Sequence, residues 1–70
     1  MPPKIRELKQ VLRQAGFREL ARRGKGSHTI WGHPAVAMLV VVAGQDGDDA
    51  KPYQVRLVTQ ALDALNKEER

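Results

Sequence analysis

Residues 27–42 read SHTIWGHPAVAMLVVV and contain two β-rich runs separated by a Gly-His-Pro turn. Residues 27–32 combine β-branched and aromatic residues, and residues 35–42 carry four valines, a composition typical of strands. The short turn between the two runs predicts an antiparallel pair. Residues 17–23 lack helical periodicity and precede a Gly-Lys-Gly turn, so they predict a third strand of the same meander.

Each end of the chain has the periodicity of an amphipathic helix. Residues 3–15 have apolar side chains at helical spacing and stop before Gly16, a residue type that favours the left-handed end of a helix. Pro3 is compatible with the first turn because its missing N–H would have no partner there. Residues 52–66 begin with Pro52 and predict a second helix. The two apolar stripes are Ile5, Leu8, Val11, Leu12 and Ala15 in the first helix and Val55, Val58, Ala61, Leu62 and Leu65 in the second.

The order of these elements predicts an α+β fold, α-β-β-β-α, with a three-stranded antiparallel sheet and both helices on one face. Seventy residues suffice for a single two-layer domain, covering residues 1–70. Alternation along residues 35–42 gives the sheet two apolar faces, although the helices cover only one. The uncovered face is expected either to meet a partner, including a second copy of the chain, or to be a harmless apolar surface.

The positive charge is concentrated near the amino terminus. Residues 1–28 hold eight bases and two acids, whereas residues 29–70 hold four bases and six acids. A basic field of this kind attracts polyanions, although a solvated helix face produces the same pattern. The absence of cysteine excludes disulfides and thiol chemistry. The longest apolar run is too short for a membrane span and the start lacks a signal-peptide core, so we expect a cytoplasmic protein without a membrane partner.

His28 is the candidate acid or base. It follows arginines, a lysine and small residues, where glycines let a phosphodiester approach the backbone N–H groups and the bases neutralise its charge. We therefore predict RNA contacts from this segment, at Arg22, Arg23, Lys25, Gly26 and Ser27. The alternative is an ordinary histidine at the start of a strand. Alternation also places His28 with Ile30 on the face expected to be the core, unless the strand end or a bulge turns it outward.

No metal or cofactor site is expected. His28 and His33 lack further ligands at zinc spacing, and the acidic loop at residues 44–49 lacks the pattern of a calcium loop. Gly24-Lys25-Gly26 matches neither the dinucleotide fingerprint nor the P-loop. His33 precedes Pro34 in a turn and is expected to be solvated and uninvolved.

The helix ending in Gly16-Phe17, the basic strand, the Lys25-Gly26-Ser27-His28 motif and the valine-rich strand resemble the HicA family. The resemblance covers residues 4–42 and, more loosely, the last helix. HicA proteins are small toxins of bacterial and archaeal toxin–antitoxin modules and act as mRNA interferases. The resemblance implies a fold similar to double-stranded RNA-binding domains, RNA cleavage without a metal or cofactor, and a catalytic role for His28. It also implies a HicB-type antitoxin that docks on the toxin and blocks access to the histidine.

The expected function is that of a metal-independent endoribonuclease toxin that cleaves mRNA, with His28 as acid or base and a 2′,3′-cyclic phosphate as the first product. One alternative is a non-catalytic RNA-binding module of the same fold. The acidic loop at residues 44–49 favours that alternative because carboxylates repel phosphate. A further alternative is a scaffold whose apolar strand face serves oligomerisation.

Overall fold

The computed structural model describes residues 1–23 and 28–68, and it describes no side chain for Arg22 and Arg23. Two helices flank three strands, so the predicted α-β-β-β-α order is confirmed. The elements are α1 (Ile5–Gln14), β1 (Arg18–Arg23), β2 (His28–His33), β3 (Val36–Ala43) and α2 (Pro52–Glu68). Over the described residues, neither helix is long and apolar enough to cross a bilayer.

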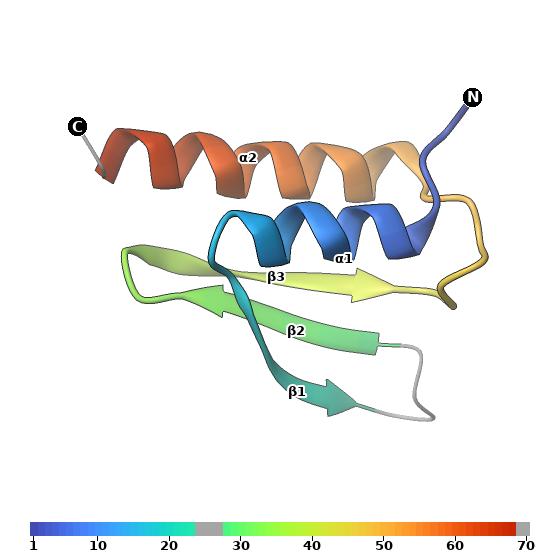
Figure 1. Cartoon of the computed structure of the whole chain (residues 1–70), viewed down its shortest axis with the longest axis horizontal. Helices are drawn as coiled ribbons and strands as arrows, with labels where there is room; N and C mark the ends of the chain where they lie inside the picture. Colours follow the sequence, from blue (N-terminus) through green and yellow to red (C-terminus); the bar gives the residue numbers. More distant parts are fainter. Residues whose placement is uncertain (24–27, 69–70) are drawn as a thin grey trace.

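The three strands form one antiparallel sheet in the order β1-β2-β3. Figure 1 shows both helices side by side on the same face of this sheet. Within the described part of the chain, no element covers the opposite face, which we call the open face. The molecule therefore has two layers, and the middle strand β2 is flanked on both sides.

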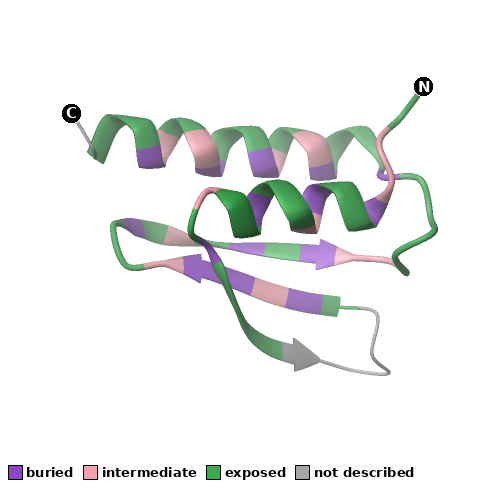
Figure 2. Cartoon of the chain, viewed as in Figure 1, coloured by how far each residue is buried: buried purple, intermediate pink, exposed green. Residues whose placement is uncertain are grey.

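The core lies between the helices and the sheet, where the buried residues in Figure 2 gather. Along β3 the predicted alternation is confirmed, because Val36, Val40 and Val42 are buried while Leu39 and Val41 are 57% and 44% exposed. The valine-rich strand thus contributes one face to the core and leaves the other on the open face.

The prediction of which β2 side chains face the core was wrong, because Ile30 and His28 were expected on the core side. Thr29 and Trp31 are buried, each at 1% exposure, whereas Ile30 is only half-buried. The core takes the large indole of Trp31, and Thr29 follows it because alternate residues share a face. His28 therefore shares the open face with Ile30, and its outward position needs no bulge.

Helix α1 ends as the sequence predicts. Gly16 has a φ of +96°, a conformation that side chains with a Cβ rarely adopt. The Gly16 N–H donates to the Arg13 carbonyl at 3.0 Å, and the Phe17 N–H donates to the Leu12 carbonyl at 2.9 Å. These two bonds are those of a Schellman motif, and they direct the chain from α1 into β1 with Phe17 in the core.

The start and the apolar stripe of α1 differ from the prediction. The helix begins at Ile5 and not at residue 3, because Lys4 is extended and forms an isolated bridge with Asp49. The Pro3 carbonyl accepts a hydrogen bond from the Ala50 N–H at 2.7 Å. Val11, expected in the stripe, is 39% exposed. Pairing with the loop before α2 therefore replaces the expected first turn.

Candidate functional site

His28 is the first residue of β2, and it is exposed. Its register partners are Arg23 on β1 and Ala43 on β3. The side chain lies on the open face because the next residue, Thr29, is buried in the core. The structure thus places an accessible imidazole at the end of the central strand, between the backbones of β1 and β3.

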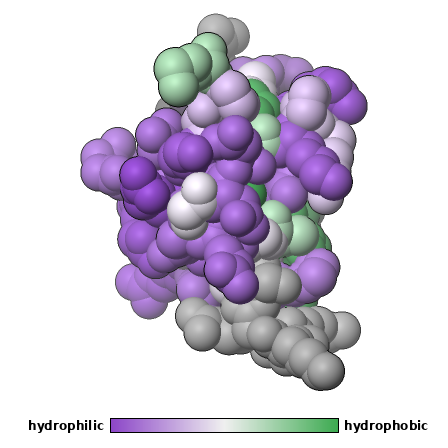
Figure 3. Space-filling view, turned by 90° about the vertical axis from the view of Figure 1, so that its right-hand side faces the viewer, coloured by the Kyte–Doolittle hydropathy of each residue, from purple (hydrophilic) through white to green (hydrophobic). Residues whose placement is uncertain are grey.

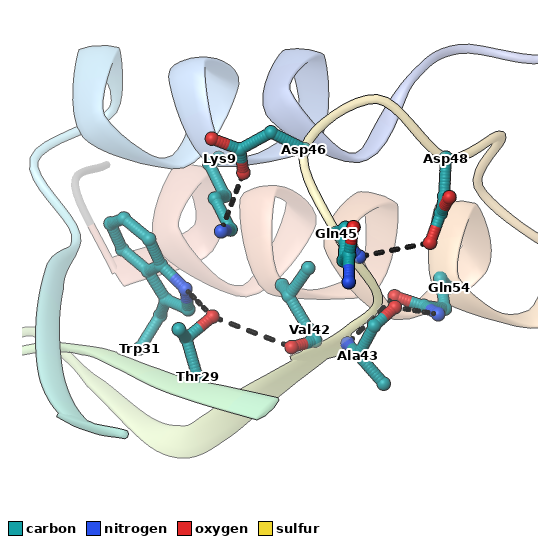
Figure 4. Close-up of polar contacts among 9 residues, drawn as sticks. All are labelled: Lys9, Thr29, Trp31, Val42, Ala43, Gln45, Asp46, Asp48 and Gln54. Carbon is teal, nitrogen blue, oxygen red and sulfur yellow. Dashed lines mark hydrogen bonds and ion pairs between the residues drawn. The ribbon is translucent and has the colours of Figure 1, made fainter. Parts of the chain in front are cut away.

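Thr29 holds the backbone next to His28 from the buried side. Its hydroxyl accepts a hydrogen bond from Trp31 Nε1 at 2.8 Å and donates one to the Val42 carbonyl at 3.4 Å, as drawn in Figure 4. The Arg13 guanidinium lies 5.1 Å from the centre of the Trp31 ring, which adds a cation–π contact. Because a satisfied buried network resists rearrangement, β2 presents His28 on a well-fixed backbone.

Gln54 holds the neighbouring strand at the same level. Its buried amide belongs to α2 and pairs with both polar backbone groups of Ala43, the register partner of His28. Gln54 Nε2 donates to the Ala43 carbonyl at 2.7 Å, and the Ala43 N–H donates to Gln54 Oε1 at 3.1 Å (Figure 4). The amide acts as a neighbouring strand would at the outer edge of β3. It ties the start of α2 to the end of the sheet that carries His28.

Part of the predicted RNA-contact set can be placed. The backbones of Arg22 and Arg23 belong to β1 and pair with those of Thr29 and His28. Lys25, Gly26 and Ser27 lie outside the described residues. The strand register therefore places the backbones of Arg22 and Arg23 on the strand next to His28.

His33 lies at the other end of β2 and has contacts within the fold. Its ring centre is 5.2 Å from that of Phe17, and its Nδ1 accepts a hydrogen bond from the Ala35 N–H at 3.0 Å. A Cβ added to Gly16 would lie 3.1 Å from His33 Nε2. Five residues of strand span roughly 16 Å, so the two histidines do not form one site. Within the described residues no group of three or more His, Cys, Asp or Glu side chains is placed to hold a metal ion.

The acidic loop packs against the start of α1. Lys9 Nζ donates to the Asp46 carboxylate at 2.7 Å (Figure 4), and Lys4 Nζ donates to that of Asp49 at 2.6 Å. The hydrogen bond and the charge of Lys9 lower the pKa of the Asp46 carboxyl. Two of the three loop carboxylates are thus paired with lysines, which reduces the repulsion of phosphate expected from this loop.

The same loop satisfies the backbone of α1. The Asp48 carbonyl accepts the Ile5 N–H at 2.8 Å, and the Asp46 carbonyl accepts the Arg6 N–H at 3.2 Å. The first N–H groups of a helix have no partner within it, and Lys4, at the N-cap, supplies no side-chain bond. The loop therefore caps α1 through its backbone.

The open face carries a shallow apolar hollow of about 270 Å³. Its centre is Gly32, where an added Cβ would lie 2.7 Å from Leu20 and 3.1 Å from Leu39. Leu20 reaches this face from the register shift between Glu19 and Ala21. Leu20 and Leu39 are both more than half exposed. The remaining lining residues are Arg18, His33 and Pro34.

A second hollow, of about 380 Å³, lies at the end of β3, and it was not among the sites predicted from the sequence. Its lining residues are Ala43, Gly44, Asp48, Asp49, Lys51, Tyr53 and Gln54. Figure 3 views this end of the molecule, where the surface of the described residues is mainly hydrophilic. An aromatic residue directly after the helix-starting Pro52 is the signal that would have indicated it.

Fold and site together define a small two-layer α+β domain with an exposed histidine at the end of its central strand. A family model described as the HicA toxin of bacterial toxin–antitoxin systems matches residues 5–64. The match covers α1, the sheet and most of α2, so the chain belongs to the HicA toxin family. Searches of curated proteins and of solved structures give no match.

Proposed function

We propose that the chain is an endoribonuclease toxin that cleaves mRNA without a metal ion and uses His28 as acid or base. Membership of the HicA toxin family supports a toxin of this kind. The observation that carries the proposal is the exposure of His28 on the open face, at the end of the central strand. Thr29 and Gln54 hold β2 and β3 in place at the end of the sheet where His28 lies.

The proposed reaction is an internal transesterification. His28 accepts the proton of a ribose 2′-hydroxyl, and the oxygen forms a bond to the adjacent phosphorus. The bond from phosphorus to the 5′-oxygen breaks, that oxygen takes up a proton from water, and His28 returns its proton to the solvent. The products are a 2′,3′-cyclic phosphate and a 5′-hydroxyl. A positioned acid or base contributes typically 10²–10⁴-fold, which suits a slow toxin.

Phosphate binding is proposed for the basic segment before His28. Arg22, Arg23 and Lys25 supply positive charge, and Gly26 and Ser27 let the RNA backbone approach closely. The register of Arg22 and Arg23 beside Thr29 and His28 supports this proposal. An mRNA substrate also places the site of action in the cytoplasm.

The test is cleavage of an end-labelled RNA by the purified chain in excess chelator, with analysis of the product ends. We expect fragments that end in a 2′,3′-cyclic phosphate, and no fragment at a position where the ribose is replaced by 2′-deoxyribose. RNA that is bound but left intact would refute the nuclease. The binding module of the same fold would then be the better description.

We also propose that a HicB-type antitoxin docks on the open face and so covers His28. Family membership implies a partner of this type. The exposed apolar side chains of the face, Leu20, Leu39 and Val41, suit a protein partner. Arg18 at the rim of the Gly32 hollow suits a partner with acidic groups. A second copy of the chain fits less well, because the described residues that line the same hollow on that copy include no acidic residue to pair with Arg18.

A further inference from the structure

The hollow at the end of β3 lies one strand away from His28. Ala43 lines this hollow and is the register partner of His28. Paired residues of adjacent antiparallel strands have Cα atoms about 4.5–5.5 Å apart. A chain of nucleotides that crosses this end of the sheet would therefore pass from His28, over Ala43, into the hollow.

Tyr53 gives the hollow a surface on which a planar ring can stack. The chain has three aromatic residues of the Phe, Tyr and Trp type, all in the described part. Phe17 and Trp31 are buried, whereas Tyr53 is 47% exposed. Its hydroxyl accepts a hydrogen bond from Gln54 Nε2 at 3.4 Å, which links the ring to the amide that holds Ala43. The exposed ring is thus tied to the strand opposite His28.

The charged groups of the hollow also suit a nucleotide. Asp49 is paired with Lys4 at 2.6 Å, and the Asp48 carboxylate accepts the Gln45 N–H at 3.0 Å (Figure 4). Lys51 is exposed and has no ion pair within the described residues. Both carboxylates therefore have partners within the chain, whereas the lysine is available to a phosphate.

We propose that this hollow is a nucleobase subsite, in which a base next to the cleaved bond stacks on Tyr53 and its phosphate contacts Lys51. This inference rests on the proposed function, because it takes the RNA at His28 as the ligand. Stacking on aromatic side chains is a common way to hold single-stranded RNA, and it tolerates different bases. Among the described residues, the open face carries no Phe, Tyr or Trp ring, since Ile30, Leu39 and Val41 are aliphatic.

The test uses RNA that binds but cannot react. A series of 2′-O-methyl hexanucleotides carries the fluorescent base 2-aminopurine at each position in turn, and its quenching reports stacking. We expect quenching by the wild-type chain at one position and none by Tyr53→Ala, whose binding should weaken about 5- to 150-fold. Tyr53→Phe should retain both, because it keeps the ring. Lys51→Gln should lower the slope of log affinity against log salt by about 0.7.

Gln60→Ala is the matched control, because Gln60 is exposed on the same helix. Wild-type quenching and affinity in Tyr53→Ala would overturn the subsite, as would an equal loss in Tyr53→Phe. Cleavage assays on the same proteins separate the two proposals. Stacking without cleavage by the wild type refutes the nuclease and keeps the subsite, whereas cleavage with unaltered binding in Tyr53→Ala refutes only the subsite.

Discussion

Thr29 shows how a single buried hydroxyl supports the candidate site. It accepts from Trp31 Nε1, donates to the Val42 carbonyl, and directly follows His28 in β2. Both Thr29 and Trp31 are almost fully buried, so neither group can turn to water if the other is removed. The cost of an unsatisfied buried polar group is larger than the net value of the bond itself.

Replacing Thr29 with Val keeps the shape and removes the acceptor for Trp31 Nε1. We expect the free energy of unfolding to fall by about 1–3 kcal/mol, measured by urea denaturation. Thr29→Ser, which retains the hydroxyl, should lose less. Thr59→Val on the exposed side of α2 is the control and should stay within about 0.5 kcal/mol of wild type. Equal free energies of unfolding for the Thr29→Val and Thr59→Val proteins would show that this hydrogen bond does not stabilise the fold.

The elements with a strong periodic pattern were predictable from the sequence. The order of helices and strands, the glycine stop of α1 and the alternation of β3 all follow from local composition. The phase of β2 does not, because Ile30 and Trp31 are both good core residues and only packing against the helices selects Trp31. Strand alternation then moves His28 to the open face.

Contacts between distant segments were not predictable. Lys4–Asp49 and Lys9–Asp46 join residues 45 and 37 positions apart, and Gln54 reaches Ala43 from the next element. No local pattern indicates that an acidic loop will cap a basic helix or that a helical glutamine will close a strand edge. The hollow at Tyr53 forms where the acidic loop meets the start of α2, so the aromatic residue after Pro52 was a local sign of it but did not place the loop beside it. The roles of His28 and the basic segment stay predictions.

The loop that caps α1 predicts a response to acid. Because Lys9 lowers the pKa of Asp46 in the folded chain, this carboxylate adds stability above the ordinary aspartate pKa of about 3.9. That stability is lost as the pH falls through the lower folded value. Asp46→Asn should remove this part of the loss of stability in acid. The measurement is the thermal unfolding midpoint between pH 2 and 7. Asp63→Asn, at an exposed position on α2, should follow the wild-type curve. A wild-type pH profile in Asp46→Asn would contradict the assignment.

At the scale of the whole molecule, the two proposed sites lie apart on one sheet. The helices cover one face, and the open face holds His28 at one end of β2 and the Gly32 hollow near the other. Four residues of strand separate His28 from Gly32, or roughly 13 Å. A protein seated in the hollow could therefore extend over His28, while a substitution in the hollow would leave the histidine unchanged.

Leu39→Lys tests the docking surface because Leu39 is 57% exposed and borders the Gly32 hollow. We expect RNA cleavage at the wild-type rate, with inhibition by a HicB-type antitoxin weakened about 30-fold, as for a central contact of an interface. Gln60→Lys adds the same charge on α2 and should be inhibited normally. Unchanged inhibition of Leu39→Lys would exclude the open face as the docking surface. A change from dimer to monomer in light scattering would instead identify a second copy as the occupant.

His28→Ala, compared with wild type and His33→Asn in the metal-free RNA cleavage assay, is the most direct measurement. Asparagine at position 33 retains a polar acceptor where His33 accepts the Ala35 N–H, so His33→Asn should cleave RNA at nearly the wild-type rate. His28→Ala should remain folded, bind RNA and lose cleavage by at least about 100-fold. Cleavage by His28→Ala at the wild-type rate would contradict the catalytic assignment of His28.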